Sequence, residues 1–215
     1  MPNWKVHLEI GKRIGNKLNY TEEEMQLFLL GNILLDINNG HIVKDISTVF
    51  DHDYTHYKID KSPTYMQFYK IYKNNINHPI LCGCLVHLYT DFLFNKDFYL
   101  RSKQSHICNL TYDELKKIKH SEFRSHNDLY IENKIEINDL IELENHLKLV
   151  ERVSVNKNDI EKVVEFLNKC EKSNSELTFY NMEELEKLME KTLDKIEWLL
   201  STLWIIRRKK YYKTK

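Results

Sequence analysis

Two long apolar runs limit what this chain can fold into more than any other feature. Residues 24–37 read EMQLFLLGNILLDI and residues 80–95 read ILCGCLVHLYTDFLFN. Runs this apolar are typical of central, buried helices. Thr21 and Glu24 have the spacing of a capping box ahead of the first run, and Pro79 is placed to open the second. We therefore expect two buried helices at the centre of the fold.

The rest of the chain also favours helices. Residues 4–18 carry apolar side chains at helical spacing, with His7 on the inner face. Only five glycines and three prolines occur in 215 residues, which argues against a turn-rich β architecture. The sequence thus predicts an all-α protein. Further helices are predicted over residues 63–74, from Thr111 onward, over parts of 121–147, and over 158–170 and 181–206.

Two segments lack helical periodicity, and we expect residues 38–62 to form a long loop and residues 97–110 to be irregular. Residues 1–150 are expected to form one helical domain. After about residue 150 the composition becomes richer in Glu and Lys, and residues 151–215 are expected to add C-terminal helices that pack on the same core.

Charge and targeting features narrow the partners. The 32 basic and 32 acidic residues cancel, so no global field favours nucleic acid, and no specific nucleic acid is predicted. There is no signal-peptide pattern and no apolar stretch of about 18–20 residues, which predicts a cytoplasmic protein. The tail 198–215 is either a packed terminal helix with a solvated basic end or a weak contact with an anionic membrane surface. The four cysteines are expected to be reduced thiols: Cys82, Cys84, Cys108 and Cys170.

His87 and Asp91 are the strongest candidates for a functional site. They are four residues apart in the second apolar run and therefore lie on the same face of the predicted helix. An ionised Asp in such a helix must be hydrogen-bonded, paired or metal-bound. A core hydrogen bond between the two is the simpler reading. His7, Asp36 and His56 offer further imidazole and carboxylate groups suited to zinc, although each also has a purely structural reading.

Four segments of the chain resemble the zinc-dependent phospholipase C family. They are W4-x-x-H7-L8-x-I10, G31-N32-I33-x-x-D36, T55-H56-Y57-K58 and G83-x-L85-V86-H87-L88-x-T90-D91. The resemblance covers roughly residues 1–130 and implies a multi-helical bundle with a zinc site between its central helices. It implies that five residues occupy ligand positions: His7, Asp36, His56, His87 and Asp91. His126 is a possible substitute ligand.

The chain also departs from that family. Trp4 is internal, so the amino-terminal ligand of the secreted enzymes is not expected, and the region after Asp91 offers Asn95 and Asp97 in place of a further histidine. We therefore expect one or two zinc ions and not three. The resemblance implies hydrolysis of a phosphodiester by metal-activated water. A free carboxylate is then needed to act as a base or to orient the water, and Asp53 and Asp128 are the candidates for this catalytic role.

The substrate stays open between a lipid and a nucleotide ester. The aromatic residues Tyr54, Tyr57, Tyr65 and Phe68 either line a groove or belong to the core. Two other functions compete with this interpretation. The adjacent pair His52-Asp53 suggests an HD-type metal phosphohydrolase, but it falls in the predicted loop. A non-catalytic helical scaffold that retains a metal site is the second.

Overall fold

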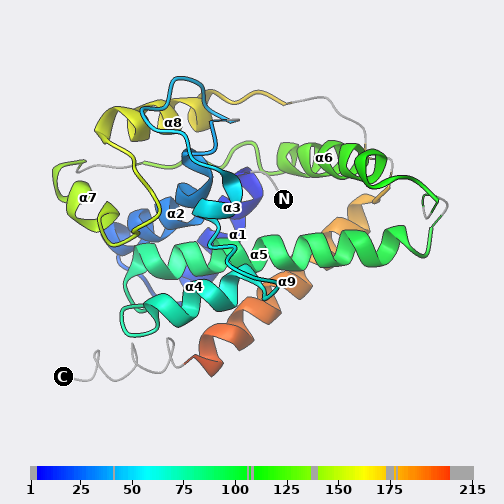
Figure 1. Ribbon diagram of the computed structural model, residues 1–215, viewed down its shortest axis with the longest axis horizontal. Coiled ribbons are helices and arrows are strands. Elements are labelled where there is room, and N and C mark those ends of the chain that lie inside the picture. The colour runs from blue at the N-terminus through cyan, green and yellow to red at the C-terminus, as the bar shows by residue number, and fades with distance from the viewer. Residues whose placement is uncertain are drawn as a thin grey trace.

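In the computed structural model, residues 4–40, 42–105, 107, 109–136, 140–172, 177 and 179–203 are described, and this part of the chain is helical with no strand (Figure 1). The all-α prediction is confirmed. The described helices are α1 (Trp4–Lys17), α2 (Glu22–Ile37), α3 (His52–Thr55), α4 (Thr64–Tyr72), α5 (Pro79–Ser102), α6 (Tyr112–Asp128), α7 (Leu140–Leu147), α8 (Lys157–Lys169) and α9 (Met182–Thr202).

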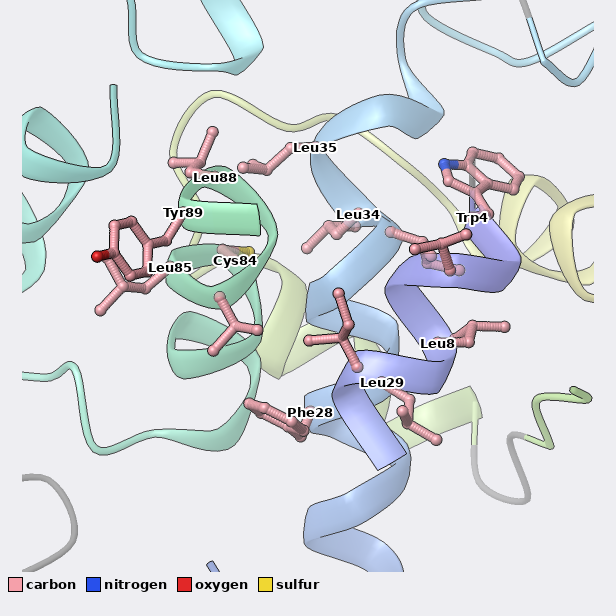
Figure 2. Packing of buried hydrophobic residues seen from close by; sticks show 14 of the residues in the cluster. Trp4, Leu8, Phe28, Leu29, Leu34, Leu35, Cys84, Leu85, Leu88 and Tyr89 are labelled. Atoms are coloured by element: carbon pink, nitrogen blue, oxygen red, sulfur yellow. The ribbon is translucent and has the colours of Figure 1, made fainter. Parts of the chain in front are cut away.

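Helices α2 and α5, formed by the two apolar runs, pack closely against each other at the centre. A Cβ added to Gly31 would lie 2.2 Å from the carbonyl oxygen of Ile80, and one added to Gly83 would lie 2.2 Å from that of Phe28. No side chain fits at either position, so the two backbones are in direct contact there. Figure 2 shows α2 between α1 and α5, with apolar side chains from all three filling the space between them.

Capping motifs fix where several helices begin. The box formed by Thr21 and Glu24 opens α2, and Pro79 lies in the first turn of α5, as the sequence predicts. Asparagine and threonine boxes open three more helices because their side chains satisfy amide groups that the helix leaves free. These boxes pair Thr111 with Glu114 at α6, Asn156 with Asp159 at α8, and Asn181 with Glu184 at α9.

Two expectations about irregular segments were wrong. Helix α5 continues to Ser102, through the first part of the segment 97–110, because Phe98 is buried and Arg101 pairs with Asp97 one turn earlier at 2.7 Å. The expected loop 38–62 contains the one-turn helix α3, where the backbone N–H of Asp53 donates to the Asp51 carboxylate as a cap.

The C-terminal helices lie against the same core. Helix α9 packs on α5 and α1, and Figure 1 shows it crossing beneath α5. Helix α8 is tied to the segment after α2, because the backbone N–H of Ser47 donates to the Asp159 carboxylate at 2.8 Å. No described helix is long and apolar enough to cross a membrane. His41, Cys108 and the basic end of the tail, residues 204–215, lie outside the described residues.

The remaining cysteines and aromatic residues are placed as follows. Cys82 and Cys84 are buried free thiols, and Cys170 is a partly exposed one. Tyr57 and Phe68 belong to the core, where the Tyr57 hydroxyl lies 2.7 Å from that of Tyr72. These two rings therefore support the fold and do not line a groove.

Candidate metal centre

Four helical segments bring five buried ionisable side chains together. One predicted ligand is on α1, one is in the last turn of α2, one directly follows α3, and two lie one turn apart on α5. The five residues are His7, Asp36, His56, His87 and Asp91, and none of them is more than 6 % exposed. They make up two overlapping groups, each with ligand atoms close enough for one metal ion: His7, His87 and Asp91 in one, and Asp36, His56 and His87 in the other. We call these five residues the cluster.

The distances within the cluster are short. The Nε2 atom of His7 lies 3.3 Å from Asp91 Oδ1, and that of His87 lies 3.5 Å from Asp91 Oδ2. The Nε2 atom of His56 lies 3.4 Å from Asp36 Oδ1 and 3.6 Å from Asp91 Oδ2. Two ligands of a tetrahedral zinc ion, each about 2.0–2.1 Å from the metal, lie about 3.3 Å apart, so these separations match the edges of such a site.

The hydrogen bonds of two histidines fix which ring nitrogen is free. His87 Nδ1 lies 2.8 Å from the carbonyl oxygen of Asn32, and His56 Nδ1 lies 3.0 Å from that of His52. A carbonyl oxygen only accepts, so each Nδ1 carries the hydrogen, and each Nε2 of a neutral ring presents a lone pair. These two Nε2 atoms are 3.1 Å apart. A positive charge must therefore sit between them, supplied either by a proton on one ring or by a metal ion.

The unsatisfied atoms of the cluster fit the same requirement. Among the described residues, neither ring nitrogen of His7 and neither oxygen of Asp91 has a hydrogen-bond partner. Buried polar atoms are normally satisfied, and a metal ion is one way to satisfy several at once. The donor set of imidazole nitrogens and carboxylate oxygens suits zinc and other first-row transition metals. The described residues can therefore hold a metal ion.

His87 limits how many ions the cluster takes. It belongs to both groups, but with Nδ1 bonded to Asn32 it has only Nε2 to offer, and that atom binds one ion. A second ion would have to rely on His7 and on the two separate oxygens of Asp91. Each group supplies three ligands and the two groups share His87, so the cluster is better supplied for one ion than for two.

The cluster also shifts the protonation of its members. Burial and the nearby His7 ring lower the pKa of His87 to about 4, so this ring is neutral near pH 7. Burial disfavours a charged His56, but the carboxylates of Asp91 and Asp36 outweigh it and raise the pKa of His56. Burial likewise opposes ionisation of Asp91, yet the three surrounding imidazoles hold its pKa well below its usual range. Ionised carboxylate and bare imidazole nitrogens are the forms that bind metals.

Residues that the sequence did not single out orient Asp36. The indole N–H of Trp4 donates to Asp36 Oδ2 at 3.2 Å, and the Asn39 side-chain amide donates to Oδ1 at 2.9 Å. The Thr55 hydroxyl donates to Asn39 in turn, at 3.2 Å. Such outer contacts fix the direction of a metal ligand. In the sequence, Trp4 stands out only as part of the segment W4-x-x-H7 and for its internal position, so its hydrogen bond to Asp36 could not be predicted, and Asn39 carried no signal at all.

A pocket of about 440 Å³ opens onto the cluster through His56 and Asp91. Its wall combines basic, acidic and aromatic side chains from α3, α5 and the segment that precedes α4. Besides those two ligands, the polar and ionisable side chains that line the pocket include His52, Asp53, Lys58, Asn95, Lys96 and Tyr99. The pocket gives a small molecule access to the buried ligands.

Three predicted site residues lie apart from the cluster. Asp53 lines the pocket but is exposed, and its carboxylate pairs with Lys58 at 2.7 Å. Asp128 lines a different cavity of about 330 Å³, together with Trp4 and Lys5. His126 is buried against the ring of Phe94, with 5.5 Å between ring centroids, and belongs to neither metal group.

The adjacent pair His52-Asp53 lies on α3, so it is helical and not in a loop as expected. The His52 ring stacks on that of His56 at 3.7 Å between centroids, which places it beside the cluster. The Asp53 carboxylate contacts Lys58 at 2.7 Å and also lies 3.7 Å from His52 Nδ1. Neither His52 nor Asp53 belongs to a metal group of the described residues, so the geometry does not favour the HD-type interpretation.

The comparisons with known proteins add no relative: no family model, no curated protein and no solved structure matches this chain. The structural support for a function therefore comes from the cluster and its pocket.

Proposed function

We propose that this protein is a metal-dependent phosphodiesterase of the phospholipase C type, with zinc as its ion. The supporting observation is the cluster itself: three imidazoles and two carboxylates with unsatisfied buried atoms, at the floor of an open pocket. The order of the four sequence segments that resemble the zinc-dependent phospholipase C family supports the same reaction class.

The chain's own residues have distinct tasks in this proposal. His7, His56, His87 and the two carboxylates would hold the ion, while Asn32 and Trp4 keep His87 and Asp36 in the ligating orientation. A bound zinc ion polarises the phosphoryl oxygen and makes water a stronger nucleophile near neutral pH. Asp53 lies at the pocket wall with its pKa lowered by Lys58, so it is ionised and able to accept a proton from water.

The pocket offers cationic contacts to an anionic substrate. Lys58, Lys61 and Lys96 line it together with three carboxylates, those of Asp53, Asp60 and Asp91, so the lysines can contact a phosphodiester although the lining has no net positive charge. Phe92 and Tyr99 add apolar surface beside them. Acyl chains and a nucleobase both suit such a surface, so lipid and nucleotide diesters are both substrates to test.

Metal content and activity test the proposal together. We expect purified protein to retain about one zinc per chain by elemental analysis, and to hydrolyse bis-p-nitrophenyl phosphate in a chelator-sensitive way. Phosphatidylcholine tested in parallel separates a lipid-directed enzyme from a general phosphodiesterase. His87→Ala should lose both metal and activity, whereas Lys187→Met on the exposed face of α9 should lose neither. Metal without hydrolysis of any diester would favour the non-catalytic scaffold, and no metal at all would end the proposal.

A further inference from the structure

A buried lysine lies behind the pocket with no carboxylate in direct contact. Lys119 on α6 is only 9 % exposed. Its ammonium donates to Asn95 Oδ1 at 3.0 Å and lies 5.2 Å from the centroid of the Tyr99 ring. Among the described residues no carboxylate forms an ion pair with it. A buried ammonium outside an ion pair is costly, and burial lowers the pKa of Lys119 although the Asp91 carboxylate acts in the opposite direction.

Lys119 determines which way the Asn95 amide faces. An ammonium group only donates, so the atom of Asn95 that it contacts is the oxygen. The Nδ2 group of Asn95 is left on the other branch of the side chain, with two N–H donors and no hydrogen bond to a described residue. Asn95 lines the pocket. Its amide hydrogens are therefore available to a ligand there.

Asn95 is also placed next to the cluster by helix geometry. His87, Asp91 and Asn95 follow one another at intervals of four along α5, so they lie on the same face in consecutive turns. Asp91 and Asn95 both line the pocket. A group that contacts the Asp91 end of the cluster thus has the Asn95 amide one turn away.

We propose that Asn95 and Lys119 form an anion subsite that binds a phosphoryl group in the pocket. The Asn95 amide donates to a phosphoryl oxygen, and the Lys119 ammonium supplies the positive charge behind that amide. The role of this subsite in hydrolysis rests on the proposed function, but its ability to bind phosphate does not. It gives a role to a buried lysine that no carboxylate contacts directly.

Two variants separate this role from a structural one. Lys119→Met keeps the length of the side chain and removes its charge. Asn95→Asp keeps the shape of Asn95, replaces its N–H donors with a repelling carboxylate oxygen and gives Lys119 an ionic partner. Asn95→Asp is therefore expected to melt at the same temperature as wild type or higher. Lys187→Met, remote from the pocket, is the matched control for removing a lysine.

Binding of inorganic phosphate, measured by calorimetry with and without added zinc, is the direct test. We expect the dissociation constant to rise at least tenfold in Lys119→Met and in Asn95→Asp, with no change in Lys187→Met and with zinc content kept in all three. KM values for a short-chain phosphatidylcholine and for p-nitrophenyl thymidine 5′-phosphate extend the test. If KM rises in the variants for both substrates, the subsite recognises the phosphoryl group that they share. If KM rises for one substrate alone, the subsite recognises the phosphoryl group of that substrate, a lipid or a nucleotide.

The outcomes distinguish the two proposals. Unchanged phosphate affinity in both variants overturns the anion subsite and leaves the metal centre untouched. Loss of phosphate binding in both variants, in protein that holds no zinc, supports the subsite while the proposed function fails. Wild-type protein that binds no phosphate under either condition overturns the subsite.

Discussion

Buried carboxylates have different surroundings in two regions of this molecule: backbone N–H donors in one, and imidazole rings in the other. Where α6 and α8 anchor neighbouring segments, Glu122 accepts backbone N–H groups of Phe179 and Tyr180 at 2.8 and 3.1 Å, and Asp159 accepts those of Ser47 and Asn156 at 2.8 and 3.0 Å. Between α1, α2 and α5, Asp91 receives no hydrogen bond from a described residue and faces imidazole nitrogens instead.

The difference separates structural from functional burial. A carboxylate surrounded by backbone donors is stabilised in place and has nothing left to bind. A carboxylate that faces imidazole nitrogens is stabilised only when a proton or a metal ion lies between them. Backbone donors around a carboxylate hold segments together, whereas imidazole rings around a carboxylate form a site that can bind a cation.

Replacing Asp91 should have the largest effect. Asp91→Asn keeps the shape of the side chain but removes the charge, and we expect zinc affinity to fall at least about 100-fold, or about 3 kcal/mol. Titration against a zinc indicator measures it. Asp53→Asn, which changes an exposed acid of the same pocket, should bind zinc like wild type. Equal affinities in wild type and Asp91→Asn would mean that Asp91 is not a ligand.

Zinc itself should stabilise the fold. At a free concentration 100 times the dissociation constant, binding adds about 2.7 kcal/mol. In a chain of this length that corresponds to a rise in Tm of about 5–10 °C. Differential scanning calorimetry with zinc and with a chelator gives the shift, and His87→Ala should abolish it. A Tm that is the same in both conditions would contradict a preformed metal centre.

Glu122→Gln tests the structural class. The neutral amide has one oxygen in place of two and brings two extra donors into a fully buried position, so we expect a loss of about 2 kcal/mol in the free energy of unfolding. Urea denaturation measures this loss. Zinc affinity should stay at the wild-type value, because Glu122 belongs to neither metal group. A variant that is as stable as wild type, or one that loses zinc, would remove the distinction between the two regions.

His126 offers a smaller and pH-dependent test. It is buried with both ring nitrogens unpartnered, like His7, but burial lowers its pKa to about 4 and no carboxylate opposes this. The unfolded chain, with a pKa near 6.5, binds a proton first, so stability is present above pH 6.5 and is lost as the pH falls toward 4. At pH 5.5 the loss from His126 is about 1.4 kcal/mol.

His126→Phe removes this titration and keeps the stacking on Phe94. Between pH 7.5 and 5.5, the variant should therefore lose about 1.4 kcal/mol less stability than wild type. Urea denaturation at the two pH values measures the difference. Parallel losses in the two proteins would show that His126 is not held neutral by burial.

Local features of the sequence predicted much of the fold. Capping boxes and apolar runs located α2, α5, α6 and α9, because both signals act within a few residues of the chain. The end of α5 and the single turn of α3 were missed. Their stability depends on a buried Phe98 and on the Asp51 cap, and the sequence shows neither burial nor cap geometry directly.

The candidate site could be predicted only in part. Helix periodicity alone places His87 and Asp91 on one face of α5. The sequence does not show that His56 is buried, that His126 lies outside the cluster, or that Asp53 and Asp128 line different cavities. Each of these depends on how distant segments pack.

The sequence by itself determined most of the helices and placed His87 and Asp91 on one helix face, since both follow from contacts within a few turns. The tertiary structure decided that His7, Asp36 and His56 meet that pair. The close approach of α2 and α5 at Gly31 and Gly83, which a single Cβ atom would block, holds the helix of Asp36 against that of His87 and Asp91. Distances between separate helices are set by packing, and packing is a property of the whole chain.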